Sequence, residues 1–181
     1  MGSKNLKAVV ARGKGRVELA NEDKVKELGR WMSQNWKDKA FGMHDLGTAG
    51  GVEGLNTIGA LPTRNFQDGQ FEGNTKISGR AMADTILIDR GGCYACPIHC
   101  KRVVEVKEGK FKVDPIYGGP EYETIGAFGS NCGVDDLAAI AKANEICNAT
   151  AADTISCGMA VSFAMECYEA GLITKKDTGG L

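Results

Sequence analysis

Apolar residues recur at helical spacing in three segments of the chain. In the first segment, residues 22–37, they are Val25, Leu28, Met32 and Trp36. A spacing of three or four residues places such side chains on one face of a helix. Asn21 stands just before the segment, and asparagine is a favoured N-cap residue. The pattern predicts an amphipathic helix over residues 22–37.

The other two helical segments lie near the end of the sequence. One is expected to begin after an Asp135 or Asp136 cap, and its apolar residues are Leu137, Ile140, Ala143 and Cys147. The other is predicted from Thr154 to Ala170 and stops at Gly171, a usual residue after a helix C-terminus. Because this last segment is apolar on most sides, we predict that it is buried. Four cysteines then read as core thiols: Cys132, Cys147, Cys157 and Cys167.

Alternating and extended patterns are shorter. Residues 6–11 are predicted to form a strand, and residues 103–113 a β-hairpin that turns at Glu108 and Gly109. Residues 82–89 read as a helix or a strand that leads into the cysteine-rich stretch described below.

The glycine-rich region between residues 41 and 80 gives weaker signals. We expect a short helix near residues 51–58 and an extended segment from Leu61 to Phe66, with Phe66 buried. Arg64 is expected to be a solvated loop residue, as charged side chains usually are. Together these elements predict a mostly α fold with a small β portion.

Composition narrows the function classes. The chain has 181 residues, a formal net charge of −1 and 43% hydrophobic residues, which suits an ordinary globular core. Scattered basic residues give no nucleic-acid surface, and no apolar run approaches the roughly 18 residues that cross a bilayer. Seven cysteines without a secretory segment indicate a reducing, cytoplasmic setting without disulfides. Both ends look cut, so we expect a piece of a longer chain.

Three cysteines dominate the candidate chemistry. Cys93, Cys96 and Cys100 have the spacing C-x2-C-x3-C, which lets one short loop aim several thiolates at a soft metal centre. Lys101 and Arg102 follow directly and add positive charge beside these thiolates. The spacing favours three ligands of a [4Fe-4S] cluster, with a fourth elsewhere.

Other interpretations of the cysteine stretch stay open at this point. His99 or a distant cysteine could complete a zinc site, although zinc ligands usually come as two well-separated pairs. The thiols could also carry no metal. Radical-SAM enzymes use the reverse order of spacings, so this stretch does not fit them.

An acidic segment is the second candidate. Glu121 and Glu123 flank Tyr122 just before an apolar stretch. Acids at a helix start are favoured by the backbone dipole, which is one explanation. A carboxylate placed for proton transfer is the other, and the sequence does not separate the two.

Several stretches together resemble the aldehyde:ferredoxin oxidoreductases. They include the cysteine motif, the segment 119–123, residues 129–137 (GSNCGVDDL), residues 153–156 (DTIS), the opening residues 1–8 and residues 61–66 (LPTRNF). The resemblance spans nearly the whole chain in the right order. It implies the helical second domain of that fold, incomplete, over residues 14–181, preceded at 1–13 by the last strand of the pterin-binding β domain.

The resemblance also implies cofactors and roles. Members of this family oxidise aldehydes to carboxylic acids at a tungsten, or molybdenum, held by two pterins beside a [4Fe-4S] cluster. Cys93, Cys96 and Cys100 would ligate the cluster, and Glu123 would assist proton transfer. The fourth cysteine and the histidine partner of the glutamate are expected downstream of this chain.

The pterin motif of the family, Asp-x-x-Gly-Leu-Asp, falls on residues 148–153. Asn148, Ala152 and Asp153 would be the pterin contacts, and only Asp153 is retained from the motif. Ala151 replaces its glycine and removes backbone freedom. Lys142 stands where some members carry an iron-binding glutamate, so no bridging iron is expected.

Partners follow from the same resemblance. Ferredoxin would receive the electrons, a small-molecule aldehyde would be the substrate, and the remaining domains of the enzyme, with further copies in a homo-oligomer, would pack around this chain. Two alternatives stay open: an iron–sulfur electron-transfer or structural domain without catalysis of its own, and a related reductase of aromatic thioesters.

Overall fold

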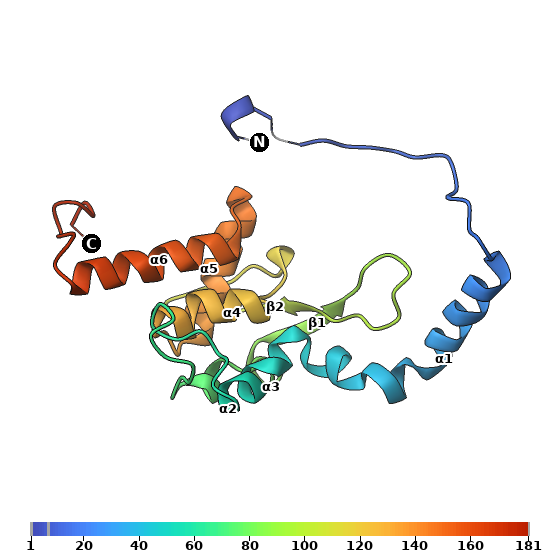
Figure 1. The fold of residues 1–181 in the computed structure, drawn as a ribbon, viewed down its shortest axis with the longest axis horizontal. Helices are drawn as coiled ribbons and strands as arrows, with labels where there is room; N and C mark the ends of the chain where they lie inside the picture. The colour runs from blue at the N-terminus through green and yellow to red at the C-terminus, as the bar shows by residue number, and fades with distance from the viewer. Residues whose placement is uncertain (1, 7, 181) are drawn as a thin grey trace. The chain divides into compact units, whose positions relative to one another are not determined.

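The computed structural model describes residues 2–6 and 8–180, and its contacts divide the chain into two units, residues 1–35 and 36–181. The first unit opens with a short 3-10 helix, Gly2–Lys4, and residues 8–20 form neither helix nor strand (Figure 1). The strand predicted over residues 6–11 is wrong for the part that is described, and Lys7 lies outside it. A strand needs a neighbouring strand to receive its hydrogen bonds, and the described residues place none there.

Helix α1 (Glu22–Leu46) confirms the first predicted helix and runs past its expected end. The amide of Lys24 donates to the side-chain oxygen of Asn21 at 2.9 Å, which is the predicted N-cap. The backbone departs from helical angles at Ala40 but the helix resumes and ends before Gly47, whose φ is +64°. None of its residues is buried within the described chain.

The second unit holds the core, built from short helices. They are α2 (Val52–Thr57), α3 (Gly79–Thr85), α4 (Tyr122–Phe128), α5 (Leu137–Thr150) and α6 (Thr154–Glu169). A short 3-10 helix precedes α2 at Thr48–Gly51, and others lie between the helices at Asn74–Ile77, Pro115–Tyr117 and Ser130–Cys132. The fully buried apolar side chains include Leu61, Ile77, Met82, Val104, Ile125 and Ile140. The predicted fold class, mostly α with a small β portion, is confirmed.

A two-stranded antiparallel sheet provides that β portion. Strand β1 (Leu87–Gly91) pairs with β2 (Lys101–Val104), and Arg90 stands opposite Arg102. The hairpin predicted over 103–113 is therefore only partly right. Val103 and Val104 pair with β1, and a single bridge joins Val106 to Val113 around the expected turn. Residues 82–89 contain the end of α3 and the start of β1.

The segment 61–68 corrects a second expectation. Leu61 is buried and Thr63 bridges to Asp68, but Arg64, Asn65 and Phe66 all have left-handed φ values, between 48° and 64°. The segment is a turn, and Phe66 is 64% exposed instead of buried. Arg64 is exposed as expected, and its guanidinium lies 3.4 Å from the Asp68 carboxylate.

The last two helices begin where predicted. Asp136 caps α5 by accepting from the amides of Ala138 and Ala139 at 3.0 and 3.1 Å. Helix α6 lies against α4, where Gly158 leaves no room for a side chain beside Ala127. Its predicted burial is wrong, because only Gly158 and Ser162 are buried. An apolar composition does not reveal how many faces of a helix find a neighbour.

The core-thiol prediction is right for two of four cysteines. Cys132 and Cys147 are buried, whereas Cys157 and Cys167 are half-buried. No helix in the described part of the chain combines the length and the apolar character that crossing a membrane requires.

Candidate functional site

The three predicted metal-binding cysteines lie on one loop, residues 92–100, which joins β1 to β2. A tight turn forms at its beginning, where the amide of Cys96 donates to the Cys93 carbonyl at 3.1 Å. Ala95 and His99 have left-handed φ values of 56° and 53°. Cys93 is exposed, and Cys96 and Cys100 are half-buried. The sheet thus brings both ends of the cysteine loop together and leaves its first half in solvent.

A buried arginine donates hydrogen bonds to the last residues of this loop. Arg102, on β2, is only 2% exposed. Its guanidinium donates to four carbonyl oxygens: Asp45 at 2.7 Å, His44 at 2.8 Å, Cys100 at 3.0 Å and His99 at 3.3 Å. Burial lowers the pKa of Arg102, and nearby Arg90 lowers it further, while Glu121, Cys100 and Asp45 oppose that shift.

A second arginine reaches the same helix end. Arg90 donates to the carbonyls of His44 and Asp45 at 3.1 and 3.2 Å, and to the Asp45 carboxylate at 3.2 Å. Carbonyls at a helix C-terminus have no partner within the helix and attract cations. The end of α1 is therefore the point to which both strands beside the cysteine loop are fastened.

Two glycines make room for the buried arginine. At Gly47 a Cβ atom would lie 2.9 Å from Arg102 Nε and 2.9 Å from the Cys100 carbonyl oxygen. At Gly119 it would lie 2.9 Å from Arg102 Cβ. Contacts this short exclude a side chain, so both positions require glycine.

The acidic segment adjoins the same arginine through Gly119. Glu121 caps α4, and its carboxylate accepts a hydrogen bond from the Thr48 hydroxyl, which also accepts from the amide of Tyr122 at 2.9 Å. Glu123 is exposed in the first turn of α4. Burial raises the pKa of Tyr122, and the Glu123 carboxylate adds to that rise. The structure thus brings the acidic segment to the base of the cysteine loop.

The predicted pterin contacts lie at the junction of α5 and α6. Asn148 donates to the Tyr117 carbonyl at 3.1 Å, and Asp153 caps α6 by accepting from the Ser156 amide at 2.7 Å. The amide of Ala152 donates to the Cys147 carbonyl at 2.8 Å. Ala151 adopts a left-handed φ of 56°, the conformation that the family glycine would take without strain. Asn148, Ala152 and Asp153 are exposed.

The thiols of the cysteine loop are the candidate donors for a metal centre. Three thiols on one short loop are the ligands that iron–sulfur clusters use, and nearby Arg102 supplies a compensating positive charge. The sulfur atoms do not converge, however: within residues 2–6 and 8–180 no group of three or more His, Cys, Asp or Glu side chains is arranged to hold a metal ion. The donors fit the chemistry of a cluster, although their side chains are not gathered at one point.

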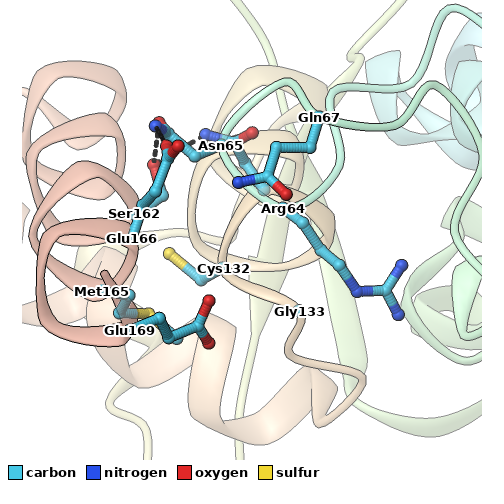
Figure 2. Close-up of a pocket in the computed structure, with 10 residues that line it drawn as sticks. Arg64, Asn65, Gln67, Cys132, Gly133, Ser162, Met165, Glu166 and Glu169 are labelled. Atoms are coloured by element: carbon cyan, nitrogen blue, oxygen red, sulfur yellow. Dashed lines mark hydrogen bonds between the residues drawn. The ribbon is translucent and has the colours of Figure 1, made fainter. Parts of the chain in front are cut away.

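A polar cavity of about 260 Å³ lies elsewhere in the second unit, between the turn at residues 64–67, residues 131–133 and α6 (Figure 2). Buried Asn131 donates to the Ser162 hydroxyl at 2.8 Å, and that hydroxyl donates to Asn65 at 3.1 Å. Asn65 in turn donates to the Glu166 carboxylate. Burial raises the pKa of neighbouring Cys132 to about 11, and Cys157 adds to the rise.

Sequence reasoning missed the residues that support the site. His44, Asp45, Gly47 and Arg90 carried no local signal, because their roles depend on segments 40 to 60 positions apart. Arg102 was recognised only as a charge. Lys142, where no iron ligand was expected, pairs with Glu145.

Comparison with known proteins gives the same picture over nearly the whole chain. The family described as "Aldehyde ferredoxin oxidoreductase, domains 2 & 3" matches residues 25–181. The tungsten-containing aldehyde ferredoxin oxidoreductases of Pyrococcus abyssi and Thermococcus kodakarensis are 45% and 41% identical to this chain over 99% of its length. An aliphatic sulfonate oxidoreductase, WOR-like subunit, of Pyrococcus furiosus is 32% identical.

These matches confirm the resemblance inferred from the motifs. The chain belongs to the aldehyde ferredoxin oxidoreductase family, and it spans 29% of the length of these relatives.

Proposed function

We propose, from this family membership, that the chain is the cluster-binding part of a tungsten-pterin oxidoreductase that oxidises aldehydes to carboxylic acids. The observation that carries the proposal is the cysteine loop. Its three thiols lie between two strands that are fastened to the end of α1 by Arg90 and Arg102. Such an anchored loop suits a permanent redox centre better than a set of free thiols.

Cys93, Cys96 and Cys100 are the proposed cluster ligands. When bound, the tungsten (or molybdenum) pterin supplies a two-electron acceptor and the [4Fe-4S] cluster a one-electron carrier towards ferredoxin. The residues of this chain would hold the [4Fe-4S] cluster. The loop keeps Cys100 beside the buried cation of Arg102, which offsets the negative charge of thiolates.

Glu123 is the proposed proton acceptor. It is exposed at the start of α4, next to Tyr122, and it makes no hydrogen bond or ion pair within the described residues. A carboxylate without a structural partner is available to take a proton from water or from an aldehyde hydrate. Glu121 differs, because its carboxylate is engaged by Thr48 and helps to fix the start of α4.

The junction of α5 and α6 is the proposed pterin contact. Asp153 and Asn148 are exposed there, and each uses one polar atom in a structural hydrogen bond. Asp153 keeps its second carboxylate oxygen for a ligand, and Asn148 keeps its amide oxygen, since a carboxylate and an amide each offer several hydrogen-bonding positions. The remaining domains of the enzyme would cover this surface.

A different substrate is the second candidate. The Pyrococcus furiosus relative at 32% identity is named as an aliphatic sulfonate oxidoreductase subunit, which favours a sulfonate as the alternative substrate. An electron-transfer role without catalysis is the remaining alternative for this part of the enzyme. Both alternatives keep the cluster; the first changes the substrate that reduces it, and the second has no catalysis of its own.

Anaerobic purification of the complete enzyme tests the proposal. We expect iron, sulfide and tungsten, and a low-temperature EPR signal of a reduced cluster on adding an aldehyde. Cys93→Ser, Cys96→Ser and Cys100→Ser should each lose the cluster, whereas Cys167→Ser, outside the loop, should keep it. Glu123→Gln should keep the cluster and lose aldehyde-dependent reduction of ferredoxin. Zinc without iron or sulfide would overturn the proposal, and reduction by a sulfonate but not an aldehyde would favour the second candidate.

A further inference from the structure

We propose that Arg102 is the positioning residue of the cysteine loop, fixing Cys100 in place before any cluster binds. This inference rests on the proposed function, because it concerns how the loop receives a cluster. The sequence already showed that Arg102 is charged. The inference adds that Arg102 holds the backbone of Cys100 in position.

The contacts of one guanidinium join two distant parts of the chain. Nη1 donates to the Asp45 carbonyl and Nη2 to the His44 carbonyl, both at the end of α1. Nε donates to the carbonyl of Cys100, and Nη2 also reaches that of His99. The backbone of a proposed ligand is thus fastened to a helix that lies more than fifty positions earlier in the sequence.

Only arginine has the shape for these contacts. Its planar fork presents five N–H donors in fixed directions, whereas a lysine ammonium concentrates three donors at one point. Lysine could keep the charge but not serve carbonyls on both sides of the fork. Gly47 and Gly119 preserve the narrow space that the fork occupies.

A further contact holds the same half of the loop. His44 Nδ1 lies 2.6 Å from the Ile98 carbonyl oxygen, so residues 98, 99 and 100 are each joined to the end of α1 or to Arg102. By contrast, the hydrogen bond from Cys96 to Cys93 is the one that orders the first half of the loop within the described residues. Cys100 is therefore preset, and Cys93 and Cys96 close on the cluster.

Two variants of the complete enzyme distinguish the effect of the Arg102 hydrogen bonds from the effect of positive charge beside the loop. Arg102→Lys keeps the charge and loses the fork, whereas Lys101→Gln removes an equal charge from the adjacent, exposed position and leaves the fork intact. Each is purified without oxygen, and three properties are measured: iron and sulfide content, the rate at which a chelator removes iron, and the EPR g-values and midpoint potential of the cluster.

We expect Arg102→Lys to lose iron at least about tenfold faster than the parent, which corresponds to about 1.4 kcal/mol, with altered g-values. Lys101→Gln should lose iron within about twofold of the parent rate and keep its g-values. If Arg102→Lys does not fold, Arg90→Lys is the second test, because it cuts contacts of a partly exposed guanidinium to the same helix end. Arg90→Lys should lose iron faster than the parent and shift the g-values.

The outcomes are distinguishable. A parent enzyme without iron overturns the proposed function and this inference with it. A parent with a cluster, and an Arg102→Lys variant identical to it, overturns the inference alone. Equal iron loss in Arg102→Lys and Lys101→Gln also overturns it, because the loss would then not be specific to the contacts of the Arg102 fork. If Arg102→Lys is insoluble, the inference is overturned when the Arg90→Lys enzyme keeps the iron-loss rate and g-values of the parent.

Discussion

The cysteine loop and the turn at residues 64–66 both contain strained backbone, but they differ in the contacts that hold it. Both place residues other than glycine at left-handed φ values: Ala95 and His99 in the loop, and Arg64, Asn65 and Phe66 in the turn. Such backbone costs free energy and persists only when its surroundings impose it. The contacts that hold the backbone therefore show how much of each region is ordered without a ligand.

The turn is held by the protein itself. The amides of Arg64 and Asn65 donate to the carbonyls of Ser130 and Asn131 at 3.1 and 2.9 Å, and the amide of Phe66 donates to the Asn131 side chain at 3.0 Å. The cysteine loop has comparable support only around residues 98–100. The turn is therefore ordered throughout by contacts within the protein, whereas the cysteine loop is ordered in one half only, and its open half carries two of the three thiols.

Removing the support of the turn should have the largest effect. Asn131→Ala removes the buried acceptor of the Phe66 amide and a donor to the Ser162 hydroxyl, so we expect a loss of about 3 kcal/mol in the free energy of unfolding. Urea unfolding followed by circular dichroism measures it. Gln34→Ala, which deletes an exposed amide, is the control and should change stability by less than about 0.5 kcal/mol. A loss below about 1 kcal/mol for Asn131→Ala would mean that the turn is held by other contacts.

Thiol reactivity separates the two regions next. Burial raises the pKa of Cys132 from 9.0 to about 11, so at pH 8 its thiolate is about 100-fold scarcer than that of an ordinary thiol. In the cluster-free protein, iodoacetamide should label exposed Cys93 first, and Cys132 at least about 100-fold more slowly. Because the neutral thiol is the native form below its pKa, labelling of Cys132 should rise as pH increases towards about 11.

Mass spectrometry after short alkylation pulses measures these rates. The difference between the two cysteines should vanish when the same protein is labelled in urea, which is the control. Equal labelling rates in the native protein would show that the region around Cys132 opens as readily as the cysteine loop.

Filling the space beside Arg102 should have an intermediate effect. Gly47→Ala combines a left-handed backbone with a Cβ atom 2.9 Å from Arg102 Nε, and we expect it to cost about 2 kcal/mol of stability. Gly59→Ala is the matched control, since its φ is +74° and its Cβ would meet nothing within 4 Å; it should cost about 1 kcal/mol. Equal losses in denaturant titrations would mean that the arginine tolerates displacement.

The open half of the loop should matter least for stability. Cys93→Ser changes an exposed side chain, so the cluster-free protein should lose less than about 0.5 kcal/mol. Cys147→Ser, a buried comparison, should lose about 1 to 2 kcal/mol because a hydroxyl is costlier to bury than a thiol. Thermal unfolding of both variants measures the contrast, and a large loss for Cys93→Ser would show that the loop tip is already packed.

The signals that were read correctly are short-range. The Asn21 and Asp136 caps are each made by a residue and an amide two or three positions later, so local sequence contains both partners. That the three cysteines share one loop follows from their spacing for the same reason, and their role as cluster ligands stays a prediction. The family resemblance added predicted roles for Glu123 and the α5–α6 junction, which local physics alone could not distinguish from ordinary helix starts; these roles stay predictions.

The misreadings have one cause. Phe66 was expected in the core because it is aromatic, yet the turn that exposes it is imposed by Ser130 and Asn131, some 65 positions away. Helix α6 was expected to be buried because it is apolar, yet within the described chain its neighbours cover one face. In both cases burial depended on a distant partner.

The sequence was enough to predict the starts of α1, α5 and α6, the cysteine loop and the family to which the chain belongs, because each depends on residues close together or on motifs in a fixed order. Only the tertiary structure decided that β1 pairs with β2, that the left-handed turn is held by Asn131, and that Arg102 is a buried clamp instead of a surface charge. A guanidinium is buried only when several carbonyls converge on it, and these come from the end of α1 and from the cysteine loop, which folding alone brings together.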